Sequence, residues 1–221
     1  MKKKWLFVLI FVLFLTAFSG CKSQNSLINN VSELRTDVFY GQSQNYKVKA
    51  GYGFKETPFN ADGKISEKDY FLTFRLIDRE IDDQTYTISF QFGEQNYNAD
   101  FKLSPVSHSL IASVEIENFN KKSFTIIISN ASNHEDVEMA SLLPENTLTF
   151  TSVLEKLQRT QSDLLKNYAD ENGNFNAEIH LRVLVKNEKP YWFIGLVEKD
   201  KMKAFLMDGL NGEILAVREV L

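Results

Sequence analysis

Few side chains in this sequence are of the kind that does chemistry on its own. The 221 residues include one cysteine, Cys21, and three histidines, His108, His134 and His180. A metal centre needs several such ligands at short spacings, and no histidine here has a histidine or cysteine partner at such a spacing. His134 opens a polar run that indicates a solvated loop, and His180 falls within an alternating segment that indicates a strand. We therefore expect no metal and no cofactor.

Asp170, Asn172 and Asn174 imitate the first positions of a calcium-binding loop. Such a loop needs glycine at its sixth position and a bidentate glutamate at its twelfth. Those positions hold Phe175 and Leu181 here. The segment is better explained as a turn that ends a helix.

Motifs of covalent and nucleotide chemistry are missing as well, because the sequence contains no G-x-S-x-G, no P-loop and no G-x-G-x-x-G. Its 29 acidic residues do not single out a carboxylate pair for glycan hydrolysis. We expect a protein that is not an enzyme, and a wall hydrolase is the least favoured alternative.

The net charge argues against one class of partner. It is −4 for the whole sequence, and without residues 1–20 it falls further, to 22 basic against 29 acidic side chains. Binding of nucleic acid needs a basic face, and so does a polybasic grip on anionic lipid. We expect no nucleic-acid partner.

The first twenty residues are typical of an export signal. Lysines at positions 2–4 precede an apolar run from Trp5 to Leu15, and small residues follow it. Even counted to Phe18, the run is shorter than the roughly 20 apolar residues that span a bilayer. We expect residues 1–20 to be removed and residues 21–36, which are polar and rich in Asn and Ser, to form a flexible tether.

The segment Phe18-Ser19-Gly20-Cys21 resembles the lipobox of bacterial lipoproteins. The resemblance implies cleavage between Gly20 and Cys21 and a diacylglycerol on the Cys21 thiol. It also implies a lipid-anchored location at the cell membrane, facing the outside of the cytoplasm. A chance cysteine after a plain signal, or an uncleaved anchor helix, remains an alternative.

Residues 37–145 show short segments with alternating apolar and polar side chains, which is typical of half-buried strands. The predicted strands cover about 46–54, 69–78, 85–92, 97–103, 109–119, 122–129 and 137–143. We expect the third and fourth of these to form one hairpin and the fifth and sixth to form another. So many strands without a helical period favour an antiparallel β-sandwich of immunoglobulin-like type.

Residues 146–221 show a different pattern. Apolar residues recur at three- and four-residue steps from Phe150 to Tyr168, which predicts one amphipathic helix. Three strand-like segments follow, at about 177–187, 191–200 and 203–220. The prediction for this part is an α+β domain with one helix and a three-stranded antiparallel meander, which makes the whole chain mainly β.

The end of the chain resembles the PepSY-type domain, a small module of exported bacterial proteins. The resemblance rests on Asp208 after a hydrophobic strand and on Gly212-Glu213 before another, with Asn211 in the turn between them. These are turn residues, so a structural role is expected for Asp208, Asn211, Gly212 and Glu213. Tyr191 and Trp192, in the preceding strand, are aromatics that could contact a partner.

Together these features predict a membrane-anchored lipoprotein that binds or regulates an envelope protein or peptide without catalysis. The PepSY resemblance implies a link to restraining extracytoplasmic peptidases. The alternative is a lipoprotein that binds a small ligand or a cell-wall polymer through aromatics between its domains.

Overall fold

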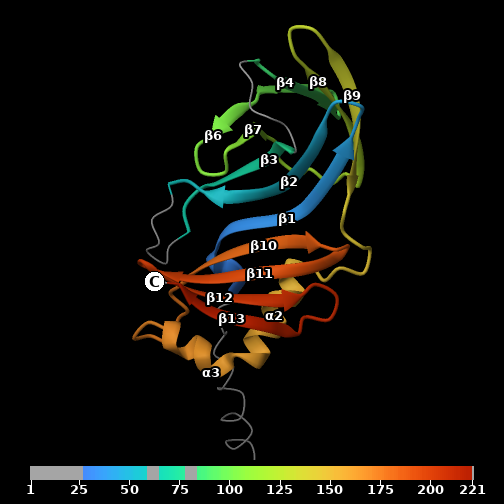
Figure 1. Cartoon of the computed structure of the whole chain (residues 1–221). Coiled ribbons are helices and arrows are strands. Elements are labelled where there is room, and N and C mark those ends of the chain that lie inside the picture. Colours follow the sequence, from blue (N-terminus) through green and yellow to red (C-terminus); the bar gives the residue numbers. More distant parts are fainter. Residues whose placement is uncertain (1–26, 59–64, 78–83, 221) are drawn as a thin grey trace, which may run out of the picture.

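The computed structural model of the protein describes residues 27–58, 65–77 and 84–220 (Figure 1). The fold is mainly β, as predicted. Its strands are β1 (Val31–Gln42), β2 (Lys47–Glu56), β3 (Lys68–Ile77), β4 (Thr87–Phe92), β5 (Gln95–Asp100), β6 (Lys102–Ser104), β7 (Ser109–Glu115), β8 (Ser123–Ser129), β9 (His134–Ser141), β10 (Glu178–Lys186), β11 (Lys189–Glu198), β12 (Lys201–Asp208) and β13 (Ile214–Val220). Its helices are η1 (Leu27–Asn30), α2 (Phe150–Thr160), α3 (Ser162–Leu165) and η2 (Lys166–Tyr168).

Strands β1 to β9 curl into a nearly closed, barrel-like sheet, which we call the barrel half (Figure 1). One arm runs β1-β2-β3-β7-β6, and the other runs from β1 through β9, β8 and β4 to β5. The alternation predicted for residues 46–54 is confirmed, because Tyr46, Val48, Ala50, Tyr52 and Phe54 are all buried. The predicted immunoglobulin-like sandwich is not confirmed by this strand order.

Strands β10 to β13 form an antiparallel meander that α2 and α3 cover on one face, and we call these elements together the meander half (Figure 1). Thr149 caps the N-terminus of α2, because its hydroxyl accepts a hydrogen bond from the Ser152 amide at 3.3 Å. Buried Val153, Leu154 and Leu157 then place one apolar stripe of α2 on the sheet. The structure therefore has two hydrophobic cores, one in each half.

The two halves share β1, and here the tether prediction is wrong for the part of it that the structure describes. Residues 27–30 form η1, and β1 starts at Val31 within the segment expected to be flexible. The first part of β1 pairs in parallel with β10, and its last part pairs with β9. Val31 and Leu34 are 1% and 5% exposed in the core of the meander half, so this stretch is part of the fold.

Close contact between β1 and β2 depends on a glycine. A Cβ atom on Gly53 would stand 1.8 Å from the carbonyl oxygen of Leu34, so no larger residue fits without moving the backbone. The pairing of the two strands shifts between Arg35 and Asp37, just beyond this contact. This irregularity lets β1 leave one core and enter the other.

Several predictions about connections are now settled. The hairpin of β4 and β5 is confirmed, and β3 is a central strand between β2 and β7. The predicted hairpin of 109–119 with 122–129 is wrong, because β7 pairs with β3 and β6 while β8 pairs with β4 and β9. The meander has four strands, since the last predicted segment turns back on itself between β12 and β13.

The predicted single helix also differs from the structure. The helix α2 ends at Thr160, and Gln161, with φ −122°, separates it from the short α3 and η2.

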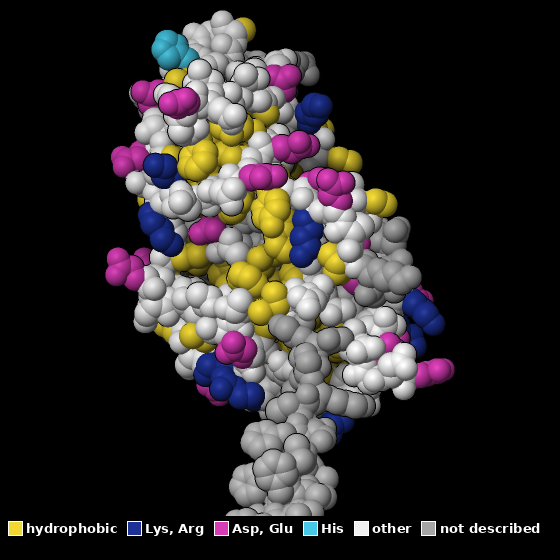
Figure 2. All heavy atoms as spheres, turned by 180° about the vertical axis from the view of Figure 1, so that it is seen from behind, with side chains coloured by type: hydrophobic (Ala, Val, Ile, Leu, Met, Phe, Trp, Pro, Cys, Tyr) yellow, Lys and Arg dark blue, Asp and Glu magenta, His cyan; other side chains and the backbone are white. Residues whose placement is uncertain are grey.

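On the rear side of the molecule, hydrophobic side chains gather in the middle of the view among acidic and basic ones (Figure 2). Apolar surface is therefore accessible on that side.

Candidate functional site

A cavity of about 570 Å³ opens at one end of the barrel half, where the two arms of the sheet do not pair. It is bounded by the start of β3, the turn between β4 and β5, and the end of β7. Its lining residues are Glu67, Lys68, Asp69, Tyr70, Phe92, Gly93, Glu94, Gln95, Tyr97, Glu115, Ile116 and Glu117. We call it the barrel-end cavity.

The aromatic walls of this cavity are held by the core behind them. The ring of Tyr97 stacks on Phe90 with centroids 5.3 Å apart, and Phe92 packs on Phe119 at 5.1 Å. Tyr70 packs on Phe54 at 5.3 Å. Because each half-buried ring rests on a buried neighbour, the cavity offers rigid aromatic faces to a ligand.

The charged walls of the cavity are mostly acidic. Among the described residues, five carboxylates line it against one ammonium group, that of Lys68. The carboxylates belong to Glu67, Asp69, Glu94, Glu115 and Glu117. They do not form a metal centre, because no group of three or more His, Cys, Asp or Glu side chains among the described residues is placed to hold a metal ion. A positively charged ligand group is what this wall attracts.

Lys68 lines the cavity and packs against two neighbours on β2. Its ammonium group lies 4.5 Å from the centre of the Phe54 ring, and Glu56 is its cross-strand neighbour. Burial lowers the pKa of Lys68, and attraction to Glu56 opposes that change. Glu56 is 3% exposed; one carboxylate oxygen accepts from the Ser66 amide at 2.6 Å, and Oε2 has no hydrogen-bond partner in the described part of the chain.

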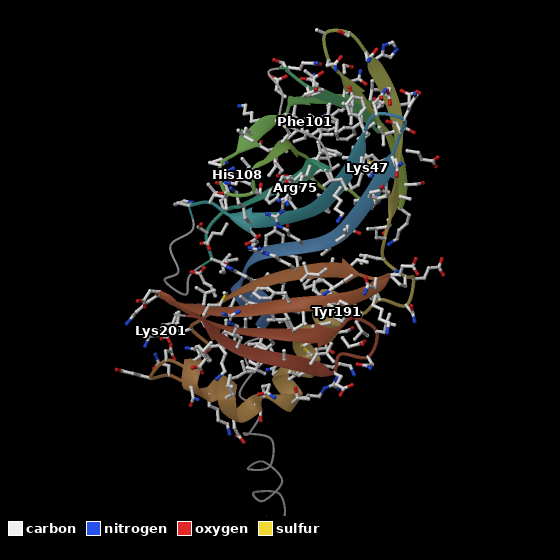
Figure 3. All side chains as sticks on the ribbon, in the orientation of Figure 1. Lys47, Arg75, Phe101, His108, Tyr191 and Lys201 are labelled. Atoms are coloured by element: carbon white, nitrogen blue, oxygen red, sulfur yellow. The ribbon has the colours of Figure 1, made fainter. Side chains whose placement is uncertain are left out.

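The two aromatics expected to contact a partner lie on opposite faces of the meander. Trp192 is 2% exposed in the core, and its indole N–H donates to the Leu148 carbonyl at 2.9 Å. The prediction that Trp192 contacts a partner is therefore wrong. Tyr191 is half-buried on the face away from α2, and Figure 3 places it on β11.

The turn that carries the resemblance at the end of the chain has the predicted structural role. Asp208 accepts hydrogen bonds from the amides of Leu210 and Asn211 at 2.8 and 3.0 Å, and these bonds lower its pKa. Asn211 accepts from the Glu213 amide at 2.7 Å, and Gly212 has φ +70°. All of these groups are used to close the hairpin of β12 and β13.

The histidines are far apart in the fold. His108 lies in the turn before β7 with φ 45°, and His134 is exposed at the start of β9. His180 is half-buried on β10; burial lowers its pKa, and attraction to Glu33 opposes that change.

The segment that imitates a calcium loop forms the predicted turn. Asp170 accepts hydrogen bonds from the amides of Asn172 and Asn174 at 2.9 and 2.8 Å. Its side chain is thereby used to hold the turn.

Gly20 and Cys21, with the whole of the expected signal and the first residues of the tether, lie outside the described residues. In the part of the chain that is described, no helix has the length and apolar character to cross a membrane.

Sequence reasoning did not find the barrel-end cavity. Alternation placed Phe92 and Tyr97 on either side of a hairpin turn, which is correct. The pairing of β3 with β7 brings Tyr70 and Glu115 into the cavity beside the turn between β4 and β5. Sequence reasoning missed this pairing because it joins residues about forty positions apart. The sequence signal that could have indicated the cavity was the clustering of acidic residues near the ends of the predicted strands.

No family model, curated protein or solved structure matches this chain.

Proposed function

We propose that the protein is a lipid-anchored, extracytoplasmic binding module that takes a segment of an envelope protein or peptide into the barrel-end cavity, without catalysis. The observation that carries this proposal is the combination of aromatic and acidic walls around a cavity of about 570 Å³. Ligand sites commonly have volumes of roughly 300–1,000 Å³ and apolar walls with a few polar groups.

The walls favour a segment with basic and apolar side chains. Carboxylates at the rim, such as Glu94 and Glu115, attract an ammonium or guanidinium group as it approaches. The faces of Tyr97 and Phe92 can then pack on its alkyl stem or hold its charge by a cation–π contact.

The anchor and the family resemblances are also part of the proposal. The lipobox-like segment ending at Cys21 supports anchoring through acyl chains, and two chains on one residue suffice for stable attachment. Support for a PepSY-like meander half comes from its helix, its antiparallel strands and the Asp208 turn. Restraint of a peptidase is then the regulatory role that the resemblance implies.

The cavity is tested by cross-linking in intact cells. A photoreactive phenylalanine analogue replaces Tyr97 in the cavity or, as a control, Tyr191 on the uncovered face of the meander. We expect one protein or peptide adduct at position 97 and none at 191, and the attached segment should contain basic and aromatic residues. An adduct only at 191, equal adducts at both positions, adducts to glycan alone, or no adduct at either position would refute the cavity as the site.

The anchor is tested separately. Cys21→Ser should move the protein from the membrane fraction to the soluble envelope fraction or the medium. Retention of this variant in the membrane would show that an uncleaved helix holds it, and the proposed acyl anchor would be wrong.

A further inference from the structure

We propose that the outer face of the barrel half binds an extended polyanion, a polymer with repeated phosphate groups, along a row of cations that crosses the sheet. The row consists of Lys49 on β2, Arg75 on β3 and Lys102 on β6, and we call it the basic row. It lies apart from the barrel-end cavity and does not depend on the function proposed for that cavity.

The register of the sheet places these residues in line. Lys49 is paired with Arg75, Arg75 with Ile111, and Ile111 with Lys102. Neighbouring strands are about 4.8 Å apart, so the row extends over roughly 14 Å. Tyr40 on β1 is paired with Lys49 and prolongs the row by one strand.

The row points away from the core. Val48, Phe74 and Phe101, which directly precede the three members of the row, are at most 6% exposed and belong to the core of the barrel half. Side chains alternate along a strand, so the row residues project outward, and all three cations are exposed. Figure 3 shows Arg75, with Lys47 from the next position on the same face of β2, over the barrel half and away from Lys201.

Folding alone gives no reason for this arrangement. Like charges directly opposite each other on paired strands, as Lys49 and Arg75 are, destabilise a sheet. Within the described residues, none of the three cations of the row makes an ion pair or a side-chain hydrogen bond. On β2, β3 and β7 the flanking positions hold Gly51, Thr73 and Ser113 on one side and Lys47 with Ile77 on the other, and the described carboxylate nearest to the row along the chain is that of Asp100, two residues before Lys102.

This concentration of positive charge contrasts with the rest of the protein. The net charge of the chain is −4. On β3 the contrast falls within one strand, because Asp69 lines the acidic cavity at one end and Arg75 lies in the basic row near the other. Among the described residues, the charge of the barrel half therefore differs between the two ends of β3.

A polymer fits the row better than a single small ion does. The cations are spread in a line across the outer surface of the curled sheet, and they do not converge on one point. Ile111 separates Lys102 from Arg75, so successive anionic groups of the polymer can meet the cations on either side of it. Tyr40, half-buried, offers an apolar ring at the end of the row.

The test uses the chain from Cys21 onward, which contains all the described residues, with long-chain inorganic polyphosphate as the probe. Binding is measured at several salt concentrations for the parent and for a variant with Lys49→Gln, Arg75→Gln and Lys102→Gln. We expect the variant to lose affinity on the order of tenfold to a hundredfold at low salt, and its salt dependence to weaken by roughly one power per cation removed. The control carries Lys186→Gln, Lys199→Gln and Lys201→Gln, an equal loss of charge on the meander half, and should keep its affinity within about twofold.

Two further arms separate the sources of anion. Orthophosphate should compete poorly, and vesicles of anionic phospholipid should bind no better to the parent than to the row variant. Equal losses of affinity in the row and control variants would show that the attraction is diffuse. Effective competition by orthophosphate would show a site for a single anion. Binding of vesicles through the row would show that its ligand is a membrane surface. Each of these results, or no binding of polyphosphate, would overturn the proposal.

Thermal unfolding without probe serves as the folding check, because removal of the opposed like charges should leave the row variant at least as stable as the parent.

Discussion

Replacement of Leu34 by alanine tests whether the start of β1 belongs to the core or to a tether. Leu34 is 5% exposed, is paired with Leu181 on β10, and lies in the core of the meander half. The substitution removes three carbon atoms, worth about 2.4 kcal/mol at roughly 0.8 kcal/mol each, and it leaves a cavity that adds to the cost. We expect the free energy of unfolding to fall by about 3 kcal/mol, which corresponds to a decrease in Tm of roughly 6–12 °C for a protein of this size.

Urea unfolding of the chain from Cys21 onward measures this change. Trp192 is then the single tryptophan, and it is 2% exposed in the same core as Leu34, so its fluorescence reports on that core directly. Leu103→Ala is the matched control, because Leu103 is 49% exposed and should cost less than about 1 kcal/mol. If both variants unfold within about 0.5 kcal/mol of the parent, Leu34 is not a core residue and the shared-strand architecture is wrong.

Three other predictions follow from local contacts. Gly53→Ala should destabilise the protein by more than about 2 kcal/mol, because the new Cβ meets the Leu34 carbonyl. Gly51→Ala, whose Cβ has its nearest contact at 3.5 Å, should cost less than about 1 kcal/mol. Chemical denaturation measures the free energy of unfolding of both variants. Burial raises the pKa of Glu33, but hydrogen bonds and attraction from Arg182 and then Arg35 lower it below 4.5 overall. Ionised Glu33 therefore stabilises the folded state above that pH. This contribution is lost as the pH falls through the pKa of the folded state. Glu33→Gln should therefore cost roughly 1–2 kcal/mol at pH 7 and progressively less below pH 4.5 in thermal melts, and a cost that does not change with pH would contradict this account. An NMR titration should show the Asp208 carboxyl ionising below 3.8, because two turn amides donate to it, and an ordinary value would mean that these bonds are absent in solution.

Local patterns in the sequence predicted local structure well. The alternation of Tyr86 to Phe92 and of Tyr97 to Phe101 gave a hairpin whose inward residues are buried or half-buried, because period-two alternation reports one buried face directly. The apolar stripe from Val153 to Leu157 likewise gave α2. The Asp208 turn was found because its residue types are needed for their own local hydrogen bonds.

The missed features depend on distant pairing. Val31 and Leu34 are apolar but three residues apart, and the shift in pairing after Arg35 interrupts alternation, so no period marks this part of β1 as a strand. Its partner β10 lies about 145 residues later and runs parallel to it. Local sequence patterns cannot predict a pairing between such distant segments, nor its direction. The false pairing of β7 with β8 followed from their closeness in sequence; in the fold Asn118, with φ 55°, and buried Phe119 carry the chain from one arm of the sheet to the other.

The two proposed sites share strands but occupy opposite ends of them. β3 begins with Tyr70 and Asp69 at the barrel-end cavity and carries Arg75 in the basic row, with buried Leu72 and Phe74 between the two sites. A packed core transmits strain, but charge effects at the exposed ends are screened over about 10 Å at ordinary salt. Loss of the basic row should therefore leave cross-linking at position 97 unchanged. If it abolished that cross-link, the polyanion and the protein segment would have to be one ligand spanning both ends, and the acidic and basic ends of the barrel half would form a single site.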